Sequence, residues 1–121
     1  MDNCIFCKIG NNDIPSKTIF EDDIVKVFLD INPISKGHTL IIPKNHYKDL
    51  DDIDIDTLNH IMRIAKDIKK LIDERLKPDG IKLVQNNGNI QEVKHYHLHI
   101  IPNYIKETNM SLDEVYEILT K

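Results

Sequence analysis

The sequence predicts an α+β fold, an antiparallel sheet of about five strands with one long helix and a short C-terminal helix. Two observations favour it. Apolar residues recur at three-to-four-residue steps over residues 54–76, which indicates an amphipathic helix. Five short runs rich in β-branched and aromatic residues, bounded by turn signals, are typical of strands: 17–21, 24–30, 38–42, 81–86 and 93–101. At 121 residues we expect a single domain, 1–121.

The first three strand runs are separated by clear breakers. Asp22-Asp23 divides the first run, a candidate edge strand, from the second. Asn32-Pro33 ends the second run, because proline donates no hydrogen bond and pushes the preceding residue out of the helical region. The turn signal Lys36-Gly37 precedes the third run, which Pro43 stops. The short loop between the second and third runs predicts an antiparallel pair.

Two helices follow from periodicity and capping. The long helix ends at Lys77-Pro78-Asp79-Gly80, and Ser111 with Glu114 three residues later forms a capping-box pattern for a helix over 111–119. The apolar stripe of the long helix consists of Leu58, Ile61, Met62, Ala65, Ile68, Ile72 and Leu76.

Composition restricts the partners. The formal net charge is -4, which argues against a protein that grips nucleic acid through a basic stripe. The first ten residues carry no secretory signal pattern, and no stretch approaches the ~20 apolar residues that span a bilayer. We therefore expect a cytoplasmic protein that binds neither nucleic acid nor membrane, although a small anionic ligand is compatible with the charge.

The two cysteines stand in Cys4-Ile5-Phe6-Cys7. In a reducing compartment such a pair is metal-binding or redox-active more often than a structural disulfide. A thioredoxin-type pair follows a strand and opens a helix, and the few residues before Cys7 leave no room for that strand. Zinc is the better interpretation, and it needs two further ligands from elsewhere.

Three histidines alternate in the last strand run, at His95, His97 and His99. Alternate residues of a strand share one face, so the three imidazoles face away from Tyr96 and Leu98. The outer two Cα atoms lie about 13 Å apart at a rise of ~3.3 Å per residue. One metal ion cannot bind all three, so the row serves at least two purposes. The alternatives are a row of ordinary surface histidines and a site that only binds metal.

The chemical interpretation gives the middle histidine the central role. A neutral imidazole can attack phosphorus if one ring nitrogen is held as N–H by an acceptor and the other directs its lone pair at the electrophile. A strand can hold His97 rigidly, a backbone carbonyl can set its tautomer, and a flanking histidine can donate to phosphoryl oxygens.

The run His95–Ile101 resembles the pattern His-φ-His-φ-His-φ-φ, with φ apolar, of the histidine-triad (HIT) superfamily, Hint branch. The resemblance extends over nearly the whole chain, through Cys4–Ile9, Ile19–Asp22, Phe28–Ile31, Gly37–His46 and Gln91–Val93. It implies the HIT-like fold and a nucleotide-binding hydrolase or transferase. Such an enzyme acts on phosphoramidates, dinucleoside polyphosphates or related nucleoside phosphates through a nucleotidyl-histidine intermediate, without a catalytic metal.

The resemblance also implies roles for individual residues. His97 would be the nucleophile, His99 would contact the phosphate and assist the leaving group, and His38 would complete the histidine cluster. Asn86 would position a phosphate oxygen with Gln91 nearby, and Asp30 would accept hydrogen bonds from the ribose hydroxyls. The base pocket would be walled by four apolar residues, for each of which plain core packing is the alternative: Phe6, Ile9, Phe28 and Ile31.

Bacterial relatives also carry a structural zinc ion, whose ligands correspond here to Cys4, Cys7, His46 and His95. This set leaves His97 and His99 for phosphate. The alternative is two free buried thiols and a solvated His46. His60, in the long helix, is expected to be exposed and receives no role.

Two positions depart from the family pattern. Ile90 stands where many relatives have glycine, in a loop that is short after Asn86. Glu92 stands where several branches have Ser or Thr, and an ionised carboxylate can only accept a hydrogen bond. We therefore expect Glu92 to point away from the phosphate or to slow the reaction, and leave it out of the site.

The leading hypothesis is thus an enzyme acting on a purine nucleotide such as AMP or GMP in amide or related linkage. The alternative is a nucleotide-binding regulatory or interaction protein with negligible turnover. A DNA-end processing relative is disfavoured by the acidic charge. The resemblance implies a homodimer that joins two sheets, and the sequence permits one through the apolar face of the long helix.

Overall fold

The computed structural model describes residues 3–106 and 108–121, so residues 1, 2 and 107 of the predicted domain lie outside the described residues. Its five strands form one antiparallel sheet in the order β1-β2-β3-β5-β4. The α+β fold is confirmed. The elements are α1 (Ile5–Gly10), β1 (Thr18–Glu21), β2 (Val25–Leu29), β3 (Thr39–Pro43), α2 (Ile55–Leu76), β4 (Gly80–Val84), the 3-10 turn η1 (Gly88–Ile90), β5 (Leu98–Asn103) and α3 (Leu112–Thr120).

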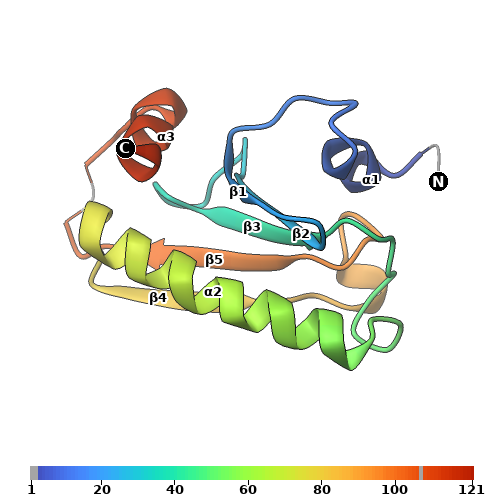
Figure 1. Ribbon diagram of the computed structural model, residues 1–121. Coiled ribbons are helices and arrows are strands. Elements are labelled where there is room, and N and C mark those ends of the chain that lie inside the picture. Colours follow the sequence, from blue (N-terminus) through green and yellow to red (C-terminus); the bar gives the residue numbers. More distant parts are fainter. Residues whose placement is uncertain (1–2, 107) are drawn as a thin grey trace.

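Side-chain alternation gives the sheet two differently covered faces. One face packs on α2 and α3 and forms the main core, with Val27, Ile41 and Ile100 fully buried. The other face carries Phe28 and Leu40, which pack against α1 in a smaller cluster. Figure 1 shows α2 lying along the sheet, with α1 and α3 at opposite ends of the molecule. Because both faces are covered, every residue of β2 and β3 is buried.

The histidine strand is shorter at its start and longer at its end than the predicted 93–101. It begins at Leu98 and continues through Pro102 to Asn103. Pairing with β3 runs from Thr39↔Ile100 to Ile41↔Leu98, so its continuation would bring Tyr96 opposite Pro43, which has no N–H to donate. The Tyr96 N–H instead donates to the Tyr47 carbonyl at 2.6 Å. Pro102 is tolerated because β5 has β4 as its only strand partner at that point within the described residues.

Helix α1 was not predicted, because six residues ending in glycine give no periodic signal. The Cys4 thiolate or thiol sulfur accepts the Cys7 N–H at 3.2 Å and caps its start. At the other end the buried Lys26 ammonium donates to the Ile9 carbonyl at 2.9 Å and to the Asn12 side chain at 2.6 Å. These contacts fix a short helix that would be unstable alone.

Helix α2 confirms the predicted periodic segment, with Asp54 as its N-cap accepting the Thr57 N–H. The apolar face proposed for pairing two chains is used within the chain, which corrects that expectation: Ile61, Ile68 and Ile72 are buried in the core. Met62 is 41% exposed. Within the described residues, no helix is long and apolar enough to cross a bilayer.

His60 has a partner, contrary to expectation. Its Nε2 lies 2.7 Å from Asp22 Oδ2, and Asp22 Oδ1 accepts the N–H groups of Ile24 and Val25. This contact ties α2 to the turn between β1 and β2.

Gly37 directly precedes His38 and has φ +88°, a backbone conformation that side chains disfavour. An added Cβ would lie 2.6 Å from Leu76 Cδ1. We predict that Gly37→Ala lowers the free energy of unfolding by about 1–2 kcal/mol, measured by urea denaturation. The control is Gly80→Ala, where a Cβ meets nothing within 4 Å, with an expected change below about 0.5 kcal/mol. An equal decrease in the free energy of unfolding of the two variants would contradict this explanation of Gly37.

Candidate active site

The histidine row lies on the sheet face opposite α2. Tyr96, Leu98 and Ile100 point into the main core, so the alternating His95, His97 and His99 point the other way. The alternation thus continues through 95–97, although that segment precedes the strand. The His97 and His99 ring centroids lie 4.9 Å apart, and Phe6 of α1 packs edge-on against His97, also at 4.9 Å.

Five of the predicted site residues meet at one cavity of about 300 Å³. They come from four segments: the end of β2, the start of β3, the end of β4 and β5 with the residues before it. The lining consists of Asp30, Asn32, Ile34, His38, Val84, Asn86, Ile90, Glu92, His97, His99 and Ile101. Because these segments converge only in the folded sheet, local sequence patterns could not bring these residues together, and only the family resemblance predicted that five of them share a site.

The remaining predicted pocket residues lie outside this lining. Phe6, Ile9 and Phe28 are buried in the smaller cluster, together with Leu40 and Ile42. Ile31 is 75% exposed and is not among the residues that line this cavity. Gln91 is buried, and its amide Nε2 donates to the Lys48 carbonyl at 2.7 Å, so it anchors the loop before β5.

The His97 ring is oriented by its own chain. Its Nδ1 lies 2.7 Å from the His95 carbonyl oxygen, which can only accept, so Nδ1 carries the hydrogen and Nε2 keeps its lone pair. Burial lowers the pKa of His97, against smaller opposing effects that include the charges of Asp30 and Glu92. His97 is therefore a neutral imidazole with an available Nε2, as the nucleophile hypothesis requires.

His38 and His99 form a hydrogen-bond chain. The Ile34 N–H donates to His38 Nδ1 at 3.0 Å, so the hydrogen of neutral His38 is on Nε2. His38 Nε2 lies 2.9 Å from His99 Nδ1 and donates to it, which leaves the hydrogen of His99 on its Nε2. Burial, with repulsion from His97 and His38, lowers the pKa of His99 to about 4. His99 therefore offers the cavity a neutral N–H donor.

Asp30, His38 and His99 are also close enough to be considered as metal ligands, with ligand atoms within 4.8 Å of one another. Asp30 Oδ2 lies 3.6 Å from His38 Nε2. However, both ring nitrogens of His38 are already engaged, one as acceptor from a backbone N–H and one as donor to His99. The trio is better described as a hydrogen-bonded group than as a metal site.

A second cluster brings together the four predicted zinc ligands Cys4, Cys7, His46 and His95. His46 Nδ1 lies 3.2 Å from Cys7 Sγ, and His95 Nδ1 lies 3.3 Å from Cys4 Sγ and 3.4 Å from Cys7 Sγ. A tetrahedral zinc ion with ordinary Zn–S and Zn–N bonds separates S and N ligands by about 3.5 Å. The observed edges are therefore of the right size.

The hydrogen bonds of His95 also suit a metal ligand. Its Nε2 donates to the Pro43 carbonyl at 2.8 Å, so its Nδ1 has a free lone pair directed at the thiols. Without a cation, partial burial and the neighbouring Cys4 raise the pKa of Cys7 to about 11. A bound cation would reverse that effect and hold the thiols as thiolates.

Glu92 lines the cavity together with His97, which corrects the first of the two expectations, that it points away. The second, that it slows the reaction, stays a prediction. Ile90 also lines the cavity and is 71% exposed. Both stand out in the sequence as departures from the family pattern, but the predictions from sequence leave Glu92 out of the site and give Ile90 no role in it. Asn32, Ile34, Val84 and Ile101 carried no comparable signal.

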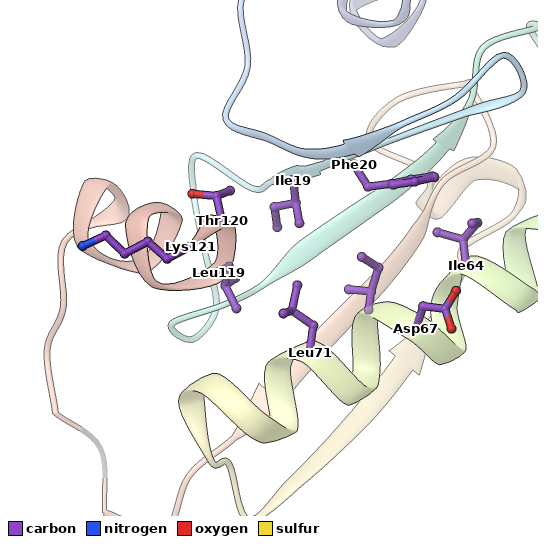
Figure 2. Close-up of a pocket in the computed structure, with 9 residues that line it drawn as sticks. Ile19, Phe20, Ile64, Asp67, Leu71, Leu119, Thr120 and Lys121 are labelled. Atoms are coloured by element: carbon purple, nitrogen blue, oxygen red, sulfur yellow. The ribbon is translucent and has the colours of Figure 1, made fainter.

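Another hollow, of about 330 Å³, lies between β1, α2 and α3 (Figure 2). Side chains such as Ile19, Leu71 and Leu119 surround it, and Asp67 and Lys121 supply its only charged side chains among the described residues. It has neither histidine nor cysteine in its lining. This hollow therefore offers neither the imidazole nor the thiol groups of the two clusters described above.

This chain is similar to known proteins over most of its length. Residues 11–106 match the family described as HIT domain. An uncharacterized HIT-like protein of Methanocaldococcus jannaschii is 46% identical over 124 residues, covering 93% of this chain and 95% of that one. The adenosine 5′-monophosphoramidase of Candida albicans is 40% identical over 116 residues, covering 91% and 76%. The crystal structure of a Zn-bound histidine triad family protein from Mycobacterium smegmatis has a TM-score of 0.90 at 32% identity, covering 98% and 91%.

The hydrogen bonds predict opposite tautomers for two histidines. At pH 7, ¹⁵N–¹H correlation spectra should place the hydrogen of His97 on Nδ1 and that of His38 on Nε2, with His99 neutral. Because its pKa is lowered to about 4, His99 should stay neutral well below the ordinary pH range of histidine. The unfolded chain takes up that proton first, so the free energy of unfolding should fall as pH drops from about 6.5 towards 4.

His38 protonated at Nδ1, or His99 titrating near pH 6.5, would contradict the proposed hydrogen-bond chain. His60 is the internal comparison in the same spectra, because it lies on α2 outside the cavity.

Proposed function

Because this chain belongs to the HIT family, we propose that it is a nucleotide-binding hydrolase that cleaves purine nucleoside phosphoramidates or related nucleotidyl bonds. The reaction passes through a covalent nucleotidyl-histidine intermediate on His97. The observation that carries this proposal is the orientation of His97, with Nδ1–H on the His95 carbonyl and Nε2 available at the cavity. The name of the C. albicans relative supports the phosphoramidate class.

Substrate binding uses the two kinds of polar group in the cavity. The Asp30 carboxylate accepts hydrogen bonds from the ribose hydroxyls, while its Oδ1 also accepts the Asn32 N–H at 2.8 Å. Asn86 donates to one phosphate oxygen, and His99 donates its Nε2–H to another. AMP and GMP derivatives both satisfy these contacts. The histidine chain strengthens the second contact, because charge grows on that oxygen as the reaction proceeds.

In the first step, the lone pair of His97 Nε2 attacks phosphorus and forms a P–N bond. The bond from phosphorus to the leaving amine breaks, its electron pair stays on the amine nitrogen, and that nitrogen takes one proton from water. The His97 ring now carries a positive charge. The His95 carbonyl, 2.7 Å from Nδ1, stabilises that charge by accepting its hydrogen bond, and Asp30 adds an electrostatic contribution.

In the second step, water attacks phosphorus from the cavity side. The P–Nε2 bond breaks, its electron pair returns to His97, and the attacking water releases a proton to solvent. That proton replaces the one consumed in the first step. The sum is one phosphoramidate and one water giving one nucleoside monophosphate and one amine, with His97 returned to its neutral form.

We also propose that Cys4, Cys7, His46 and His95 hold a structural zinc ion. Bound there, zinc would link α1 to the segment before β5 and so fix Phe6 against His97. The Zn-bound M. smegmatis relative supports the assignment. The metal takes part in no bond-forming step.

The expected homodimer belongs to the same proposal. The apolar face of α2 is buried within the chain, so pairing has to use another surface. The outer edge of β4, with Leu83 at 44% exposure, is a strand edge that a second sheet could extend.

The His97→Asn variant tests the reaction, with adenosine 5′-phosphoramidate as substrate. We expect release of AMP to fall by about 10³-fold or more, because no other neutral imidazole directs a lone pair at phosphorus. His60→Asn is the matched control, and its rate should stay within about twofold of wild type. Retention of most of the activity in His97→Asn would refute the nucleophile. Tight AMP binding without turnover of any phosphoramidate or dinucleoside polyphosphate by the wild type would favour the regulatory alternative.

Metal analysis tests the zinc assignment separately. Protein purified without chelator should contain about one zinc per chain, and Cys7→Ser should lose most of it and unfold at lower urea concentration. His97→Asn should keep its zinc, because that ring is not a ligand. A zinc content near zero in the wild type would count against the assignment.

A further inference from the structure

The histidine cavity has an unusual charge for a site that takes a phosphate ester. Within the described residues its lining contains two carboxylates, Asp30 and Glu92, and neither lysine nor arginine. His38, His97 and His99 add no positive charge at pH 7, because the hydrogen bonds described above assign each of these rings a single N–H, as in a neutral imidazole. A polyphosphate leaving group would bring several further negative charges into this field. The lining therefore disfavours such leaving groups.

The two carboxylates lie towards opposite ends of the histidine row. Asp30 is next to His38, which contacts His99. Glu92 also lines a neighbouring hollow with Cys4, His46 and Lys94, beside the His95 end of the row. His97 lies between these ends. With the ribose on Asp30, as in the proposed function, the group that leaves from phosphorus has room on the Glu92 side.

The loop that carries Glu92 is held in place. The buried Gln91 amide donates to the Lys48 carbonyl, and the Gln91 N–H donates to the Gly88 carbonyl at 3.0 Å. Ile90 and Glu92, on either side of Gln91, both line the cavity. Lys94 Nζ donates to the Gly88 carbonyl, and no lysine or arginine of residues 3–106 and 108–121 lies within ion-pair distance of Glu92. Its charge is available to a ligand.

We propose that Glu92 makes the enzyme prefer nucleoside phosphoramidates whose leaving amine carries an aliphatic chain and a second, positively charged group. Diamines and lysine-like amines are this class. The exposed Ile90 side chain contacts the aliphatic part, and the Glu92 carboxylate pairs with the distant ammonium. The inference rests on the proposed function. The covalent steps are those given above, and the distant ammonium changes neither their atoms nor their electrons.

Three adenosine 5′-phosphoramidates test this preference. They are made from 1,4-diaminobutane, from pentylamine, which has the same chain length without the charge, and from 4-aminobutanoate, which carries a negative charge. We expect kcat/KM of the wild type to be about two- to fivefold higher for the diamine than for the pentylamine compound, the size of one charge pair that involves an exposed carboxylate. The carboxylate compound should be poorest, and added salt should narrow the differences.

Glu92→Gln removes the charge and keeps the shape of the side chain. In this variant the ratio of diamine to pentylamine kcat/KM should fall to about one, each variant being judged by its own ratio. Glu74→Gln, on the exposed part of α2, is the matched control and should keep the wild-type ratio.

The outcomes separate this inference from the function on which it rests. A wild-type ratio near one, or a high ratio that Glu92→Gln leaves intact, would overturn the role of Glu92 while hydrolysis itself stands. Turnover of none of the three compounds by the wild type would overturn the proposed function, and this inference with it. Loss of the ratio in Glu74→Gln as well would also contradict the assignment to Glu92.

Discussion

One residue, His95, connects the two functional clusters of this protein. Its side chain donates from Nε2 to the Pro43 carbonyl and directs Nδ1 at the two thiols. Its backbone carbonyl accepts the Nδ1–H of His97. The same backbone position therefore completes the candidate metal cluster and sets the tautomer of the candidate nucleophile. A displacement of His95 would disturb both, so the packing around it limits how much the site can change.

The surrounding helices and strands hold the histidine side chains in place. Helix α1 brings Cys4 and Cys7 to His95 and places Phe6 edge-on against both His95 and His97. Lys26, near the start of β2, holds the far end of α1. On the other side of the row, the Ile34 N–H sets the tautomer of His38, which in turn sets that of His99. Hydrogen bonds alone thus leave His97 with an available lone pair and His99 with an N–H donor, and both rings stay neutral.

Patterns with a strong local cause could be predicted from the sequence. The alternation of His95, His97 and His99 predicted that their side chains share one face of the sheet. This alternation is observed although β5 begins only at Leu98, because it continues into the preceding segment. The capping box at Ser111 predicted the start of α3, and the spacing of apolar residues predicted α2. The features that the sequence did not predict depend on tertiary contacts. Pro43 ends the pairing that would have lengthened β5, α1 is stabilised only by its neighbours, and the orientation of Glu92 follows from the anchoring of Gln91.

The central claim is that the hydrogen bond from His97 Nδ1–H to the His95 carbonyl makes Nε2 the atom that accepts the nucleotidyl group. The most direct measurement is to quench the enzyme in alkali during turnover of a labelled adenosine phosphoramidate, digest it, and locate the adenylyl group by mass spectrometry. The account predicts one adenylyl group, attached to His97 through Nε2. Attachment to His99 or to another residue, or an unmodified chain during rapid turnover, would contradict it.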